Sequence, residues 1–218
     1  MREERAVVAQ HEPVAGASAP KGTLNAARWN EVLDAAAAVF AEKGYQAARI
    51  EDIAARVGIL KGSLYYYIES KEDLLYALTV SGHTKGLATI EEDDETRAAD
   101  PATRLGAFIV RWTLMIPTTG EYAPVTERDV QQLSDERRAE VMQIRNEMHG
   151  YVRRIIEQGI ADGQFDAATD PGVATNSIFE MLNSTVRWFR PTGRLTYDDL
   201  SAYYRTFVLR GLAPGSTT

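Results

Sequence analysis

Apolar residues recur at spacings of three and four along most of the chain, which is the period of a helix that buries one face. From about Asn25 the recurring positions are Trp29, Val32, Leu33, Ala36, Val39 and Phe40. Gly44 follows, at the place where a left-handed cap residue is expected. The pattern predicts an amphipathic helix that ends just before Gly44.

Two shorter helices are predicted next, over about residues 50–57 and 61–67, with Gly58 between them. Ser70 and Asp73 then resemble a capping box that opens a longer helix. Two short helices joined by a glycine turn have the form of a helix-turn-helix, whose second helix enters the major groove of DNA.

Cap residues predict the helices of the second half. Asp100-Pro101 and Asp170-Pro171 each place an acceptor at the cap and a proline at the first helical position. The first of these helices is expected to cover about residues 101–116 and to end at Pro117. No segment has the pattern of a strand, so the predicted fold is all-α with about nine helices.

Two more helices bring the number predicted individually to eight. Ser134 is expected to cap a long helix that reaches about Ala161, with Gly163 just past its end. Thr196 and Asp199 are expected to cap a last helix that ends near Gly211.

Composition excludes several classes of protein. The 218 residues include no cysteine, 24 Lys+Arg and 31 Asp+Glu, so the net charge is −7 and neither disulfides nor thiolate-bound metals are possible. No apolar run approaches the roughly 20 residues of a membrane span, and the N-terminus lacks a signal-peptide pattern. We expect a cytoplasmic protein with no membrane contact, and we read residues 1–22 as a flexible arm.

The predicted helix over residues 61–67 carries the chemistry of DNA contact. Leu64 has the spacing to face inward, so Lys61, Ser63, Tyr65 and Tyr66 are expected to face outward. They offer a cation for phosphate, a hydroxyl donor and two phenols that can bind phosphate or contact a thymine methyl group. Gly62 lets the backbone come close to a sugar-phosphate strand.

These residues also carry a family resemblance. The stretches Phe40 to Tyr45 (FAEKGY), Asp52 to Ala55 (DIAA), Lys61 to Tyr67 (KGSLYYY) and Ser70 to Leu75 (SKEDLL) resemble the N-terminal domain of TetR-type transcriptional regulators. The resemblance implies a homodimer that binds a palindromic operator and is released by a small-molecule effector. It implies a DNA-binding domain over residues 23–70, an effector-binding and dimerisation domain over 71–213, and a tail over 214–218.

Two positions depart from the family pattern. Ala48 and Leu60 stand where the family usually has hydroxyl residues that cap a helix and reach a phosphate. We therefore expect positioning on the DNA backbone to rely on Arg49, Lys61, Tyr66 and Lys71. Of the site residues, Arg49, Gly62, Tyr67 and Lys71 are expected to hold either phosphates or the helix geometry. Residues 1–80 hold nine Lys+Arg and eleven Asp+Glu, so any basic surface must be assembled by the fold.

The second domain is expected to hold the effector. An apolar cavity with arginines would suit an amphipathic ligand that carries a carboxylate or phosphate, although aromatic and methionine stripes are more often plain core. The segment Val186 to Thr196 is similar to a TetR branch that controls fatty-acid and steroid breakdown, which implies an acyl-coenzyme A effector. The candidate pocket residues are Phe108, Arg111, Trp112, Met115, Arg145, His149, Phe179, Asn183 and Arg187.

The last two helices are expected to form the dimer interface by the same resemblance. The candidates are Ala174, Ile178, Leu182, Val208 and Leu212, whose spacing fits an intermolecular or an internal seam equally well. Two other functions stay open: a helical ligand-binding or protein-interaction dimer without specific DNA binding, and an enzyme acting on a lipid thioester. The enzyme is disfavoured because no nucleophile and base are paired, and the isolated histidines give no metal or cofactor motif.

Overall fold

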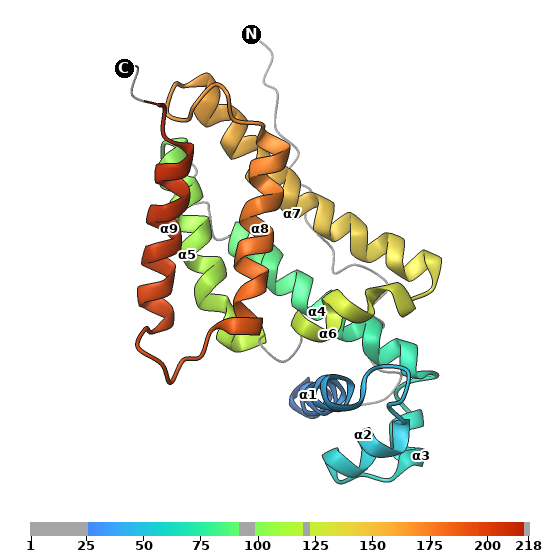
Figure 1. The fold of residues 1–218 in the computed structure, drawn as a ribbon. Coiled ribbons are helices and arrows are strands. Elements are labelled where there is room, and N and C mark those ends of the chain that lie inside the picture. Colours follow the sequence, from blue (N-terminus) through green and yellow to red (C-terminus); the bar gives the residue numbers. More distant parts are fainter. Residues whose placement is uncertain (1–25, 92–98, 120–122, 216–218) are drawn as a thin grey trace.

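The computed structural model describes residues 26–91, 99–119 and 123–215, and within these ranges the chain is helical with no strand. The predicted arm, most of the acidic run Glu91 to Glu95 and the end of the tail lie outside the described residues. Figure 1 shows the helices, whose bounds are α1 Ala26–Lys43, α2 Ile50–Val57, α3 Lys61–Tyr65, α4 Lys71–Glu91, α5 Pro101–Thr119, α6 Ala123–Asp129, the 3-10 turn η2 Val130–Gln132, α7 Asp135–Ala161, α8 Pro171–Trp188 and α9 Tyr197–Leu212.

The helix-turn-helix forms as predicted. Gly58 closes α2 with φ of 76°, and its N–H donates to the carbonyls of Ala54 and Ala55. Only glycine adopts this left-handed backbone without strain, which explains the residue at the turn. Helix α3 ends at Tyr65, two residues before the predicted end, and Tyr67 and Ile68 follow it in a turn.

Pro117 does not end its helix, and this prediction is wrong. Helix α5 continues to Thr119 with Pro117 inside it. A proline removes one backbone N–H and crowds the carbonyl of the preceding turn, which is tolerated here because only two helical residues follow it.

The segment between α5 and α7 holds α6 and η2, two short elements that the sequence pattern did not reveal. Ser134 precedes α7 as predicted, but its hydroxyl makes no cap hydrogen bond. Instead, its backbone N–H donates to the Glu72 carboxylate, 2.9 Å away. The start of α7 is therefore held by a side chain from α4.

The other predicted caps are present. The N–H of Val173 donates to Asp170 at 2.8 Å, and Thr196 and Asp199 form a reciprocal capping box. These contacts satisfy backbone donors at the starts of α8 and α9 that would otherwise have no partner.

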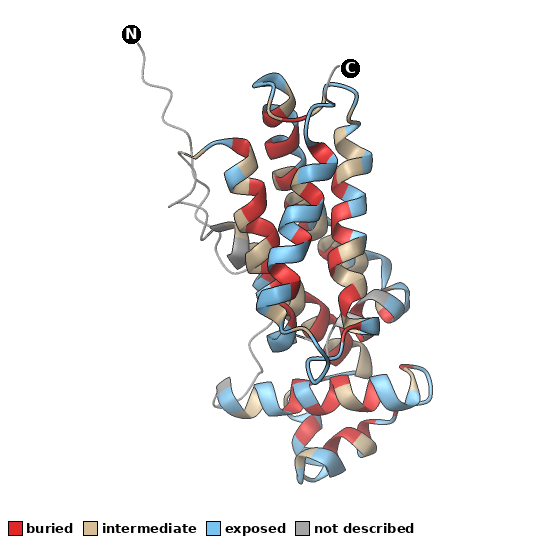
Figure 2. Cartoon of the chain, turned by 60° about the vertical axis from the view of Figure 1, so that its left-hand side comes forward, coloured by how far each residue is buried: buried red, intermediate tan, exposed pale blue. Residues whose placement is uncertain are grey.

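The buried residues form two cores, one above the other in Figure 1. The lower core joins α1, α2, α3 and the first half of α4 to residues of α6 and α7. The upper core joins α5, α8 and α9 to the second half of α7. Figure 2 shows the buried stripe on each helix facing these cores.

Helix α4 reaches both cores, so it connects them physically. Its second half lies very close to its neighbours at Gly86, where an added Cβ would stand 2.8 Å from the Met148 sulfur and 3.0 Å from the Trp112 ring. No described helix has the length and apolarity needed to cross a membrane.

Candidate functional site

Helix α3 presents the predicted outward face. Leu64 is fully buried and fixes the rotation of the helix. Lys61, Gly62 and Ser63 are consequently exposed, as is the Tyr65 ring, and 64% of Tyr66 is accessible. A cation, a hydroxyl and two phenols therefore stand on one open surface.

Lys71 lies away from that surface. Its ammonium donates to the carbonyls of Tyr45, Gln46 and Ala48 at 2.6, 3.2 and 3.0 Å. It also lies 4.4 Å from the centre of the Tyr45 ring, and its burial lowers the pKa of Lys71. All three donors are directed at the loop between α1 and α2, so this contact geometry suits a positioning role.

Tyr67 is half-buried and also supports the helix geometry. Its ring packs against the lower core and meets the edge of the Tyr66 ring, with 5.2 Å between ring centres. This contact limits the directions in which Tyr66 can point.

The two departures from the family pattern have different surroundings. Ala48 is buried, and the cap position before α2 is Arg49, whose N–H donates to Asp52 at 3.1 Å. Leu60 is the cap residue of α3, provides no side-chain hydrogen bond and is 80% exposed. An apolar side chain beside α3 can contact thymine methyl groups, and sequence reasoning missed this possibility.

A second site lies between α4, α5, α6, α7 and α8. It is an apolar cavity of about 100 Å³, comparable to the space for a small hydrocarbon group. Of the predicted pocket residues, Trp112, Met115, Arg145, His149, Phe179 and Asn183 line it. The lining residues that were not predicted are Gly82, His83, Ile116, Thr126, Val130, Val141, Met142, Met148 and Val186.

Three predicted pocket residues do not line the cavity. Phe108 is fully buried in the upper core, where its ring packs on those of Trp112 and Phe179. Arg111 is half-buried on α5, and Arg187 is exposed near the end of α8. The cavity wall therefore carries one arginine, Arg145, which lies 3.9 Å from Glu180.

Two histidines give the cavity hydrogen-bonding capacity. His149 stacks on Phe179, with ring centres 4.1 Å apart, and its Nδ1–H donates to Asn176 at 3.2 Å. The His83 Nδ1–H donates to the Thr79 carbonyl at 2.7 Å. Burial lowers the pKa of both histidines, so both are neutral at pH 7 and each keeps Nε2 as an acceptor.

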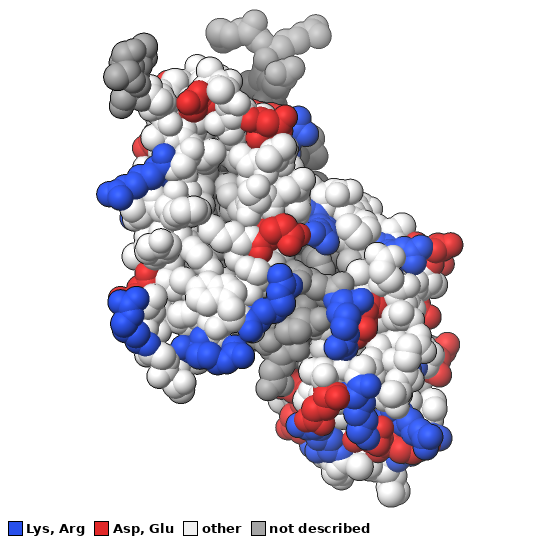
Figure 3. Space-filling model, viewed as in Figure 1, with Lys and Arg blue, Asp and Glu red and all other residues white. Residues whose placement is uncertain are grey.

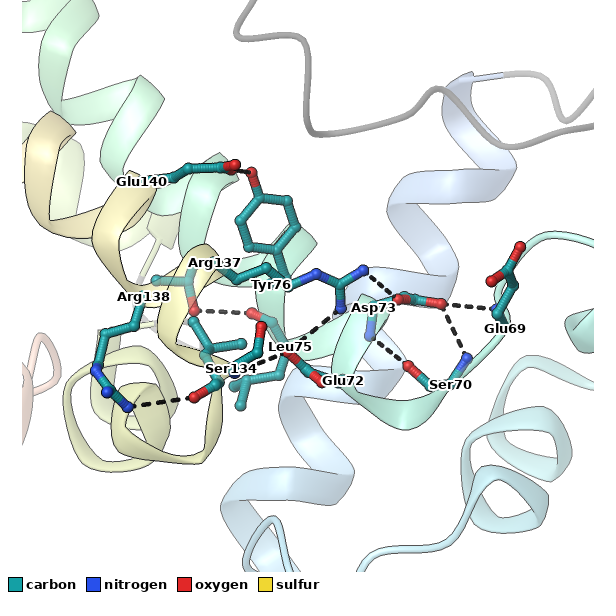
Figure 4. A network of polar contacts seen from close by, with 12 residues as sticks. Glu69, Ser70, Glu72, Asp73, Leu75, Tyr76, Ser134, Arg137, Arg138 and Glu140 are labelled. Carbon is teal, nitrogen blue, oxygen red and sulfur yellow. Dashed lines mark hydrogen bonds and ion pairs between the residues drawn. The ribbon is translucent and has the colours of Figure 1, made fainter.

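A polar network joins the start of α4 to the start of α7 (Figure 4). One Arg137 nitrogen lies 2.6 Å from Asp73 and the other lies 3.5 Å from Glu72. Glu72 also accepts the Ser134 N–H, which lowers the pKa of Glu72. We call Glu72, Asp73, Ser134 and Arg137 the α4–α7 clamp.

Two neighbouring contacts reinforce the clamp. The Tyr76 hydroxyl donates to Glu140, and burial together with this bond raises the pKa of Tyr76 to about 12. From α6, Arg128 donates to the Phe40 carbonyl of α1 at 2.8 Å. The cavity wall and the helix-turn-helix are thus linked by side-chain contacts as well as by α4 itself.

The residues predicted for the dimer interface lie on α8 and α9. Ile178, Leu182, Val208 and Leu212 are buried in the upper core of one chain, and Ala174 packs against that core. The same helices carry exposed apolar side chains at Val173, Tyr203 and Phe207. A groove between α8 and α9 is lined by four of the predicted residues, Ala174, Ile178, Val208 and Leu212, together with Tyr203 and Phe207.

Comparison with known families accounts for both halves. The family model described as "Bacterial regulatory proteins, tetR family" matches residues 32–78, and "Tetracyclin repressor-like, C-terminal domain" matches residues 98–212. The chain belongs to the TetR family. The N-terminal match spans most of α1, all of α2 and α3 and the start of α4, and the C-terminal match spans α5 to α9.

Relatives within the TetR family cover nearly the whole chain. The HTH-type transcriptional repressor KstR2 of Mycobacterium tuberculosis is 31% identical over 88% of this chain and 95% of its own length. The structure of that ketosteroid transcriptional regulator aligns with a TM-score of 0.74 over 89% of this chain and 98% of that one.

Two further proteins extend the comparison. The fatty acid metabolism regulator of Bacillus subtilis is 26% identical over 73% of this chain and 81% of its own length. AibR, solved in complex with isovaleryl coenzyme A and operator DNA, is 25% identical with a TM-score of 0.69, over 87% of this chain and all of that one.

Proposed function

We propose that the protein is a transcriptional repressor that binds an operator through α3 and leaves it when an acyl-coenzyme A thioester occupies the cavity between α4 and α8. The observation that carries the proposal is one helix, α4, which borders the cavity at Gly82 and His83 and packs against the helix-turn-helix at its other end. We infer that it acts in the cytoplasm with the DNA and that it does not turn its effector over.

The DNA contacts follow from the open face of α3. Lys61 and Arg49 contact phosphates, and Tyr65, Tyr66 and Leu60 lie closest to base edges, with Ser63 as a hydroxyl donor. Gly62 permits close approach of the backbone. Lys71 and Tyr67 act indirectly, because Lys71 holds the α1–α2 loop and Tyr67 supports Tyr66.

The cavity suits the acyl part of such an effector. Its wall is mainly apolar, with the acceptors of His83 and His149 and the donors of Arg145 and Asn183 among the side chains. A volume of about 100 Å³ accommodates a small acyl group and excludes a coenzyme A moiety, which must stay outside. KstR2, a regulator named for ketosteroids, and AibR with its bound isovaleryl coenzyme A support this class of effector.

The repressor acts as a dimer through α8 and α9. We assign the interface to the exposed side chains of Val173, Tyr203 and Phe207 and to the groove beside them, which the predicted residues Ala174, Ile178, Val208 and Leu212 line. An isologous pairing of these faces puts two α3 helices on one duplex, as a palindromic site requires.

One variant tests the DNA-binding half of the proposal. Lys61→Ala combined with Tyr66→Ala removes a phosphate contact and an exposed phenol, while Leu64 and the core stay intact. We expect the double variant to remain folded and dimeric and to lose the gel shift on the operator. Unchanged binding would show that α3 does not contact the operator.

A second pair of variants tests the effector half. Met115→Trp fills the cavity, whereas Leu114→Trp adds the same ring at an exposed position on the same helix. With short-chain acyl-coenzyme A thioesters as probes, Met115→Trp should bind the operator but resist release, and Leu114→Trp should behave like the parent. Equal release from both variants would place the effector elsewhere.

A further inference from the structure

The charges of the three N-terminal helices largely neutralise one another. Residues 26–70 contain five basic and six acidic side chains. Four of the five basic groups make ion pairs with acidic neighbours: Arg28 with Glu31, Lys43 with Asp52, Arg56 with Glu42, and Lys61 with Glu51. Within the described residues, Arg49 is the basic group of this segment that has no such pair.

This pairing leaves few cations of residues 26–70 without a carboxylate neighbour. Figure 3 shows Lys and Arg intermingled with Asp and Glu over the three N-terminal helices. A protein gains affinity for any duplex by replacing condensed counterions with its own cations. Cations already held by carboxylates contribute less to such sequence-independent binding.

The pair between Lys61 and Glu51 differs from the others because Lys61 is the cation of α3 itself. The Lys61 ammonium lies 2.6 Å from a Glu51 oxygen and 5.4 Å from the centre of the Tyr65 ring. Glu51 belongs to the first turn of α2 and Lys61 begins α3. The contact thus sets a carboxylate beside the exposed face of α3.

Both partners are ionised at neutral pH. The hydrogen bond from Lys61 lowers the pKa of Glu51, and the same bond raises the pKa of Lys61. Any phosphate that approaches Lys61 must therefore displace the Glu51 carboxylate or lie close to its negative charge. Both side chains are about half exposed, so the pair is weak enough to be displaced.

Displacement favours one kind of complex over another. In a complex fixed by base contacts, one phosphate is held next to Lys61 and can replace the carboxylate. In a sequence-independent complex the duplex slides, so no phosphate stays beside Lys61 and the carboxylate keeps the ammonium paired. Glu51 consequently lowers the affinity for non-cognate DNA more than the affinity for the operator.

We propose that Glu51 is a specificity-determining residue, which holds Lys61 in the free protein and suppresses binding to DNA that lacks the operator sequence. This inference rests on the proposed function, because it concerns the same α3 surface. On this proposal, discrimination between DNA sequences depends on an acidic side chain and not on an additional basic one.

The test compares Glu51→Gln with Glu42→Gln, the matched control that removes the same charge from the Arg56 pair. Binding of a fluorescent mixed-sequence duplex is measured by anisotropy as salt is raised. Glu51→Gln should bind this duplex roughly two- to fivefold more tightly than the parent, the size expected for an exposed ion pair. The slope of log K against log salt should steepen by roughly 0.9, the value for one more phosphate contact.

A third variant shows whether Glu51 acts through Lys61. In a Lys61→Gln background, adding Glu51→Gln should change the affinity no more than Glu42→Gln does. An equal gain from Glu51→Gln and Glu42→Gln, or a gain from Glu51→Gln that persists without Lys61, would overturn the inference, as would no gain at all.

The two proposals fail in different ways. If the parent protein shows no operator preference but Glu51→Gln still binds mixed DNA more tightly through Lys61, the proposed function falls and the role of Glu51 in restraining DNA binding stands. If the operator preference is normal and Glu51→Gln leaves it unchanged, only the inference about Glu51 falls.

Discussion

Single side chains in the helix-turn-helix divide into those that face outward and those that fix the backbone. Lys61 and Lys71 both lie in the segment that the N-terminal family model matches, yet Lys61 is exposed with one ion pair and Lys71 donates to three carbonyls. The sequence predicts DNA contact for Lys61 but leaves Lys71 open between phosphate contact and support of the helix geometry, because it shows the charge and not the acceptors around it.

The two lysines predict opposite consequences of the same substitution. Lys71→Met should lower the free energy of unfolding by roughly 1–3 kcal/mol, because hydrogen bonds from a charged donor are lost. Lys61→Met should change it by no more than about 0.5 kcal/mol, as for most exposed sites. Urea titration measures both.

DNA affinity completes the comparison of these lysines. At a temperature where both variants are folded, Lys61→Met should bind the operator more weakly than Lys71→Met does. If Lys71→Met lost more operator affinity than Lys61→Met and kept normal stability, Lys71 would be a phosphate contact after all.

His83 predicts a pH dependence of stability. Burial lowers the pKa of His83 in the folded protein. As the pH falls below the ordinary histidine value near 6.5, His83 is therefore protonated in the unfolded chain before it is protonated in the folded one, and this favours unfolding. The stabilisation is thus complete above that pH and declines below it, by at most about 1.4 kcal/mol per pH unit for one site.

A variant isolates this contribution. Between pH 7.5 and pH 5.5, the free energy of unfolding measured in urea should fall less in His83→Gln than in the parent. His149, whose pKa is lowered too, contributes equally to the fall in both proteins. An identical decline in the two proteins would mean that His83 does not titrate with folding.

At the scale of elements, sequence reasoning succeeds where a helix has a local signal. The cap residues Asp170 and Thr196 and the glycine at position 58 lie where the corresponding helices begin or end. Pro117 gave a wrong prediction because a helix tolerates proline in its last turn, so the residue need not end the helix. Helix α6 has only seven residues, and its one local signal, Pro124 in the first turn, was not used in the sequence prediction.

The cavity shows the same limit. Met142, Arg145 and His149 share one face of α7 because they are spaced by three and four residues, and this spacing could have placed Met142 in the pocket. Arg111 and Arg187 lie on the same helices as true lining residues, but the sequence does not give the rotation of α5 and α8. Contacts between distant segments, such as the α4–α7 clamp, have no local signal at all.

The clamp predicts how the cavity communicates with DNA. Arg137 ties α7, which carries Met148 and His149 into the cavity wall, to the first turn of α4. Arg137→Met should leave operator binding near the parent level but reduce the ratio of operator affinities without and with effector by roughly fivefold or more, a typical coupling energy.

The matched control is Arg153→Met on the same helix, which removes an exposed ion pair with Glu157. Anisotropy titrations with and without effector give the ratio for each protein. If the ratio is unchanged in Arg137→Met, or falls equally in the control, the clamp does not transmit the effector signal.

At the scale of the whole molecule, the exposed apolar side chains of α8 and α9 predict the assembly. Phe207 is 60% exposed within one chain, and its ring stacks on that of Tyr203. Phe207→Glu should convert a dimer into monomers, because a dimer would have to bury the new charge.

Leu60→Glu is the control, since it places the same charge on the exposed surface next to α3. Sedimentation velocity should report a monomer for Phe207→Glu and a dimer for Leu60→Glu. A dimer in both would place the interface on another face.

The central claim is that one molecule couples an operator-binding surface to an effector cavity. Its most direct test is fluorescence-anisotropy binding to fragments of the DNA that flanks the protein's own gene, titrated with salt and then with acyl-coenzyme A thioesters. The account predicts tight, salt-dependent binding to one fragment over the others, reversed by a thioester. Equal binding of all fragments at low salt would contradict it.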